Sequence, residues 1–66
     1  MKIYINGELT SVENELTAKN LIKRLGYENA RIALEVNNKV VPRSSFENRL
    51  IAPNDKIEII TAVGGG

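Results

Sequence analysis

Three stretches of the chain alternate between hydrophobic and polar residues, and each is short enough to be a single strand. In all three, every second residue is apolar, which is the period of a half-buried β-strand. We therefore expect strands at residues 1–6, 31–36 and 56–61. The inward sets are Met1, Ile3 and Ile5; Ile32, Leu34 and Val36; and Ile57 and Ile59, with Ile60 on the opposite face of the last strand.

Two turn signals extend this pattern into hairpins. Asn6-Gly7 favours a two-residue type I′ turn, which needs positive φ at both central positions. A second strand should follow at residues 8–12, with Leu9 and Val12 as its apolar members. Asn37-Asn38 also suits a tight turn because asparagine tolerates left-handed backbone. A short strand at 39–41 then ends before Pro42.

One segment has the period of a helix instead. Thr17 is a suitable N-cap, and Leu16 and Leu21 stand where a hydrophobic staple requires them. Gly26 is placed to end the helix as a left-handed cap. The predicted apolar stripe is Ala18, Leu21, Ile22 and Leu25.

The remaining loop, residues 44–50, is expected to form a single helical turn or irregular structure. Phe46 and Leu50 are its apolar residues, and we expect both to pack on the core. Pro53-Asn54-Asp55 reads as a turn before the last strand, since proline favours its second position.

The order of elements indicates an α+β fold. A two-residue hairpin makes the first two strands antiparallel, and a last strand that is apolar on both faces belongs in the middle of a sheet. Placing that strand parallel to the first, with the helix across one face, buries every inward set. This predicts a β-grasp (ubiquitin-like) fold, a mixed sheet of four to five strands covered on one face by one main helix. We expect the domain at residues 1–63 and a flexible glycine tail at 64–66.

Composition excludes several kinds of chemistry. The 66 residues include no cysteine and no histidine, which removes disulfides, thiol catalysis and the usual zinc sites. The eight acidic residues are scattered and are expected on solvated surfaces, so we predict no catalytic residue and no metal site. A net charge of +1 gives little support for binding nucleic acid or membrane. We expect a cytoplasmic protein, a monomer when free, that is not itself an enzyme.

The chain ends in Val63-Gly64-Gly65-Gly66. Glycine lacks a Cβ and allows backbone to pass through narrow spaces. One interpretation is a linker or frayed end. The other is a thin arm of Val63, Gly64 and Gly65 that presents the α-carboxylate of Gly66 to another protein's active site. Tyr4, Ile60 and Ala62 would then form an apolar docking patch, although scattered exposed apolar residues are also normal.

These features together resemble the ThiS family of sulfur carriers in thiamine biosynthesis. The resemblance covers the whole chain and is carried by its length, by Asn6-Gly7, by Asn37-x-x-Val40-Val41-Pro42-Arg43 and by the glycine terminus. It implies that a ThiF-like adenylyltransferase, using ATP and magnesium, activates Gly66 as an acyl-adenylate. A sulfur donor such as a cysteine desulfurase then yields a thiocarboxylate, whose sulfur thiazole synthase consumes. The domain itself would bind no cofactor.

Two other classes of protein stay open at this point. The small subunit of molybdopterin synthase is a related carrier with a Gly-Gly end. A non-catalytic interaction module, either TGS-like or a ubiquitin-type modifier, would have a similar fold pattern without carrying sulfur.

Overall fold

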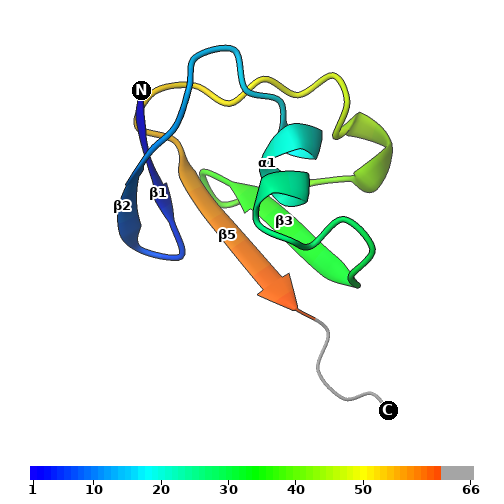
Figure 1. Ribbon diagram of the computed structural model, residues 1–66. Helices are drawn as coiled ribbons and strands as arrows, with labels where there is room; N and C mark the ends of the chain where they lie inside the picture. Colours follow the sequence, from blue (N-terminus) through cyan, green and yellow to red (C-terminus); the bar gives the residue numbers. More distant parts are fainter. Residues whose placement is uncertain (62–66) are drawn as a thin grey trace.

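The computed structural model describes residues 1–61, which form a mixed five-stranded sheet with one α-helix packed on one face (Figure 1). The sheet order is β2-β1-β5-β3-β4, with β5 parallel to β1 and antiparallel to β3. This is the predicted β-grasp arrangement. The elements are β1 (Lys2–Ile5), β2 (Glu8–Ser11), α1 (Ala18–Arg24), β3 (Ile32–Val36), β4 (Lys39–Val41), the 3-10 helix η1 (Arg43–Ser45) and β5 (Lys56–Thr61).

Both predicted hairpins close through residues with positive φ. Asn6 and Gly7 have φ of 48° and 86°, and Asn37 and Asn38 have φ of 53° and 69°. Positive φ at both central positions is what a type I′ turn requires, and its twist matches that of the strands it joins. The turns fix the registers, so that Tyr4 lies opposite Leu9 in the first hairpin.

The helix begins and ends at the predicted caps. The Thr17 hydroxyl accepts a hydrogen bond from the backbone N–H of Asn20 at 3.2 Å. At the other end Gly26 has φ of 86°, its N–H donates to the Lys23 carbonyl, and the Tyr27 N–H donates to the Ile22 carbonyl. This pair of bonds is a Schellman motif. No heavy atom lies within 4 Å of a Cβ built at Gly26, so the backbone conformation alone favours glycine there.

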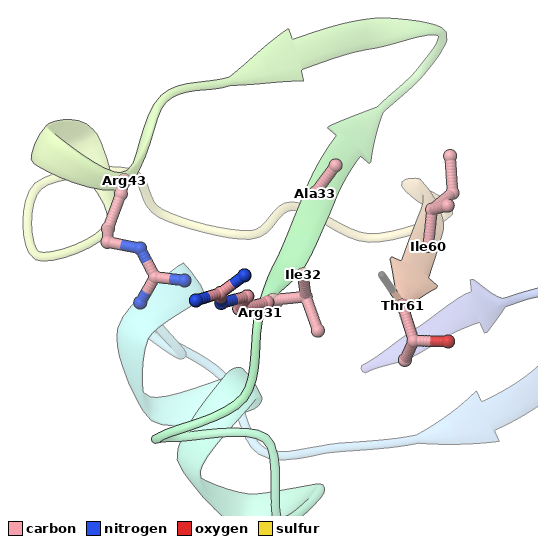
Figure 2. Close-up of a pocket in the computed structure, with 6 residues that line it drawn as sticks. All are labelled: Arg31, Ile32, Ala33, Arg43, Ile60 and Thr61. Atoms are coloured by element: carbon pink, nitrogen blue, oxygen red, sulfur yellow. The ribbon is translucent and has the colours of Figure 1, made fainter. Parts of the chain in front are cut away.

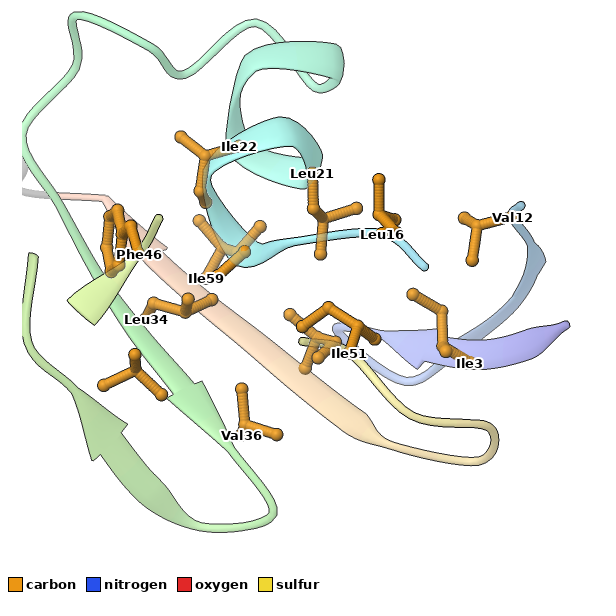
Figure 3. Close-up of a cluster of buried hydrophobic side chains, with 13 residues drawn as sticks. Ile3, Val12, Leu16, Leu21, Ile22, Leu34, Val36, Phe46, Ile51 and Ile59 are labelled. Carbon is orange, nitrogen blue, oxygen red and sulfur yellow. The ribbon is translucent and has the colours of Figure 1, made fainter. Parts of the chain in front are cut away.

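The core lies between the helix and the covered face of the sheet (Figure 3). It joins residues from every strand except β2 to the helix and the loops, and Val12 enters it immediately after β2. Its buried side chains are Ile3, Val12, Leu16, Ala18, Leu21, Ile22, Leu34, Val36, Val41, Phe46, Ile51, Ile57 and Ile59.

Two predicted inward leucines are exposed instead. Leu25 is 36% exposed because the helix ends at Arg24 and Leu25 is its C-cap. Leu50 is 59% exposed, and its neighbour Ile51, at 4%, takes the core position. Leu50 lies in an extended bridge with Thr17, where successive side chains point to opposite sides. The prediction for Leu50 was therefore wrong by one residue, whereas Phe46 is buried as expected.

Side chains complete the hydrogen bonding of β5 where its neighbours end. The Asn6 side-chain oxygen accepts from the Ile59 N–H at 2.8 Å, just beyond the last residue of β1. At the other end Asp55 is buried, and its carboxylate accepts from the Asn37 side-chain amide at 2.9 Å and from the Ala52 N–H at 2.8 Å. The Asn37 oxygen in turn accepts from the Lys56 N–H at 3.0 Å. Asp55 thus joins the Asn37-Asn38 turn to the turn that starts β5.

Replacing Asp55 by alanine should therefore lower the free energy of unfolding by about 1–3 kcal/mol, because the part-buried hydrogen bonds from Asn37 and Ala52 lose their charged acceptor. Urea unfolding monitored by circular dichroism measures this loss. Asn48→Ala, at an exposed loop position, is the control and should stay within about 0.5 kcal/mol of the wild type. Equal stabilities for the two variants would contradict the assigned role of Asp55.

Candidate functional site

The face of the sheet opposite α1 has no helix over it, and several large apolar side chains are exposed there. Strand alternation places Tyr4, Leu9, Val40 and Ile60 on this uncovered face, and the four are 37%, 57%, 68% and 53% exposed. On the covered face, by contrast, Ile3 of β1 and Ile57 of β5 are 0% and 1% exposed. The sheet therefore separates a packing surface from a surface that is available to another molecule.

Ile60 lies near the end of the described chain. It is opposite Ala33 on β3, and the next residue, Thr61, is the last one described. The prediction that Ile60 faces away from Ile57 and Ile59 is confirmed by their burial at 1% and 7%. We call Ile60 and Ala33 the tail-side patch.

Tyr4 shares this face with Ile60 but lies at a distance from it. In the parallel register Tyr4 is opposite Lys56, four residues before Ile60 on β5. At about 3.3 Å per residue this separates the two positions by about 13 Å. Tyr4 instead pairs with Leu9, and we call these two the hairpin-side patch. The structure thus places two predicted patch residues on the expected face without bringing them together.

Two carboxylates occupy the middle of this face. Glu58 of β5 lies directly opposite Glu35 of β3, and like charges in such a pair destabilise a sheet. Neither is in an ion pair within residues 1–61, where the salt bridges are Lys19–Glu47 and Arg24–Glu13. The uncovered face is therefore not arranged for stability alone.

A groove of about 420 Å³ adjoins the tail-side patch (Figure 2). It lies where β3 begins and β5 ends, and Arg31 and Arg43 both line it, with side chains that extend toward each other (Figure 2). Neither arginine was predicted as a site residue, although Arg43 ends the Asn37-x-x-Val40-Val41-Pro42-Arg43 motif. No local pattern predicts that the two come together, because only the fold brings the start of β3 next to η1. The lining residues are Arg31, Ile32, Ala33, Arg43, Ile60 and Thr61.

The carboxyl groups whose pKa values are shifted lie outside this groove and outside the uncovered face. A hydrogen bond from Arg24 lowers the pKa of Glu13, and one from Lys19 at 2.9 Å lowers the pKa of Glu47. Both pairs tie α1 to neighbouring loops and are solvent-exposed. Residues 1–61 contain no group of three or more potential metal-ligating acidic side chains. In the same part of the chain no helix has the length and apolarity needed to cross a membrane.

The other predicted site residues lie outside the described residues. They are the docking residue Ala62, the arm Val63, Gly64 and Gly65, and the modified residue Gly66. The predicted domain boundary after Val63 lies there too.

Comparison with known proteins identifies the class to which this fold belongs. Over its full length the chain superimposes on the whole crystal structure of a thiamine biosynthesis protein (ThiS) from Geobacter metallireducens, with a TM-score of 0.86 and 26% identity. It is also 26% identical to the sulfur carrier protein ThiS of Escherichia coli, covering 100% of both chains. A model of the ThiS family matches residues 3–66. The chain belongs to the ThiS family of sulfur carriers for thiamine biosynthesis.

Two further relatives broaden this picture. The chain is 39% identical to an uncharacterized protein, ycf40, of Porphyra purpurea, covering 100% of this chain and 93% of that protein. It is 36% identical to a thiazole synthase of Paramagnetospirillum magneticum, of which it spans only 20% of the length.

The family assignment bears on the alternatives raised by the sequence. It favours a thiamine-pathway carrier over a molybdopterin synthase subunit and over an interaction module. Members of this family are carrier proteins, so the chain is a carrier and not an enzyme.

The two faces of β5 predict that the same substitution has a small effect on stability at Ile60 and a large one at the adjacent Ile59. Ile60→Glu should lower the free energy of unfolding by about 1 kcal/mol or less, the range of strand propensities at exposed sites. Ile59→Glu should abolish cooperative folding, because it buries a carboxylate without a partner. Thermal and urea unfolding of both variants test this. If the Ile60→Glu variant were as unfolded as the Ile59→Glu variant, the face that carries Ile60 would have to be packed in the free domain.

Proposed function

We propose that this chain carries sulfur as a thiocarboxylate on the α-carboxyl group of Gly66 and delivers it for thiazole formation. The observation that supports this most is the family match, which extends to residue 66 and so includes the glycine terminus. A chain with no cysteine and no histidine also needs a site for sulfur other than a side-chain thiol, and the terminal carboxylate supplies one.

The chemistry proceeds in two displacements. A carboxylate is a poor electrophile, so a ThiF-like adenylyltransferase with ATP and magnesium first joins a Gly66 oxygen to the α-phosphorus of ATP, and pyrophosphate leaves. A sulfur nucleophile then attacks the acyl carbon, the bond to the AMP oxygen breaks, and AMP departs. If the sulfur comes from a cysteine desulfurase persulfide, a thiol must cleave the resulting acyl disulfide to release the thiocarboxylate. The partner enzymes supply the groups that stabilise these steps.

Thiazole synthase is the proposed acceptor of the sulfur. The full-length match to a segment of a protein named thiazole synthase supports this pairing, since a carrier joined to its acceptor would raise the effective concentration of the sulfur donor. The carrier's own part in this step is to present a narrow glycine arm that the acceptor's active site can enclose.

The uncovered sheet face is the proposed docking surface for these partners. Ile60 forms its tail-side end, Ala62 is the further patch residue expected from the sequence, and Tyr4 with Leu9 forms a second apolar contact about 13 Å from Ile60 along the strands. Exposed apolar side chains that lead toward the reacting terminus are suited to hold a partner while the arm enters its active site. Val63, Gly64 and Gly65 would make up that arm.

Gly66 should gain sulfur when the chain is incubated with the adenylyltransferase of the same organism, ATP, magnesium and a sulfur donor. Intact-mass spectrometry should detect the acyl-adenylate without the donor, and with the donor the mass expected when sulfur replaces one carboxyl oxygen. A chain lacking Gly65 and Gly66 is the matched control and should gain neither. Absence of both products from the full chain, with this enzyme and with a molybdopterin-type activator, would exclude the carrier function.

Ile60→Glu should weaken binding to the adenylyltransferase by about tenfold or more, because a charge would lose its water at an apolar contact. Leu50→Glu is the control, because Leu50 lies outside the five-stranded sheet and is 59% exposed, close to the 53% of Ile60. Its affinity should stay within about twofold of that of the wild type. Titration calorimetry of the two folded variants measures this difference. Equal affinities would place the docking surface elsewhere.

A further inference from the structure

The groove beside the tail-side patch combines an apolar lining with two cationic side chains. Ile60 and Ala33 contribute to its wall from neighbouring strands, and Arg31, just before β3, and Arg43 of η1 line it with side chains that extend toward each other (Figure 2). An apolar surface next to guanidinium groups fits an occupant that is itself part apolar and part anionic, because each half then meets a complementary surface.

Arg43 is held in place before any partner binds. One guanidinium nitrogen donates to the Ala30 carbonyl at 3.2 Å, and the group lies 5.7 Å from the centroid of the Phe46 ring. Phe46 is buried, so this aromatic support belongs to the core. A guanidinium group has five donors, and the Ala30 carbonyl is the one hydrogen-bond acceptor that Arg43 has within residues 1–61. Less side-chain entropy is lost when a partner binds a group that is already positioned.

Within residues 1–61, neither arginine forms a salt bridge. The cations paired in that part of the chain are Lys19, with Glu47, and Arg24, with Glu13. Arg31 and Arg43 therefore present two positive charges that no described carboxylate neutralises. Arginine prefers planar, bidentate carboxylate partners, and it is enriched at protein interfaces.

The position of the groove also indicates which part of a partner it contacts. An arm extended from Thr61 to Gly66 spans about 17 Å, so arginines beside Thr61 are far from a carboxylate reacting at its tip. They are thus suited to contact the surface around the opening through which a partner admits the arm, and not the reacting atoms.

We propose that this groove binds an acidic segment of the activating partner, with a carboxylate of that segment on Arg31 and Arg43 and an adjacent apolar side chain on Ile60 and Ala33. The inference rests on the proposed function and adds to it a charged contact at the base of the arm. This contact sets the orientation of the carrier, because it lies beside the apolar docking surface and not within it.

The test compares two charge reversals in the full-length chain. Arg31→Glu changes the groove, whereas Arg49→Glu makes the same charge change at an exposed arginine that does not line it. Arg31 makes no side-chain hydrogen bond within residues 1–61, so both variants should fold, which thermal unfolding checks. Titration with the adenylyltransferase of the same organism should show affinity about tenfold weaker for Arg31→Glu and within about twofold for Arg49→Glu. The Arg31 effect should shrink at high salt.

The chain's own C-terminal carboxylate is the competing occupant. A full-length chain with Gly66 as its α-amide removes that charge, and Arg31→Glu should weaken binding of the amide form by the same factor. Loss of the effect in the amide, or tighter binding by Arg31→Glu, would mean that the arginines hold the terminus, and would overturn the proposal.

The remaining outcomes distinguish a failure of the groove inference from a failure of the proposed function. If the wild type acquires a thiocarboxylate but Arg31→Glu binds as tightly as it does, or both reversals weaken binding equally, only the groove inference fails. If the wild type neither binds the enzyme nor is adenylated by it, the proposed function fails, and the inference fails with it.

Discussion

The pairing of β5 with β1 on one side and β3 on the other is the interaction on which the rest of the structure depends. It joins the two hairpins into one sheet and creates a single apolar face wide enough for α1 to cover. A domain of this size buries only about 60% of its unfolded surface, and this one has no cysteine for a disulfide. Its stability therefore rests on that one face being continuous.

The same pairing leaves the other face of the sheet uncovered. Because strand side chains alternate, Ile57 and Ile59 fill the core while Ile60 is exposed between them and the tail. The exposed apolar residues, together with Glu35 opposite Glu58, do not add to the stability of the free domain. Their arrangement is understandable if this face is completed by other proteins, as a carrier that visits several enzymes requires.

The groove gives the proposed interface a direction. Apolar patches alone allow a partner to bind in several orientations, since hydrophobic contact is non-directional. In the proposed interface, Arg31 and Arg43 at one end of the face would restrict the partner to the orientation that meets them. Because β5 ends beside them at Thr61, this contact would join correct docking to delivery of the arm.

Local signals in the sequence determined the elements, their caps and the inward faces of the three alternating strands. Asn6-Gly7, Asn37-Asn38, Thr17 and Gly26 act within a few residues of themselves, so their effects could be read from the chain. The glycine terminus and the family resemblance likewise belong to the sequence. Tertiary structure alone decided the register of β5, which separates Tyr4 from Ile60. It also decided that Ile51, and not Leu50, is buried in the core. It also brought Arg31 and Arg43 to one groove, because contacts between residues distant in sequence depend on how whole strands pair and not on any local pattern.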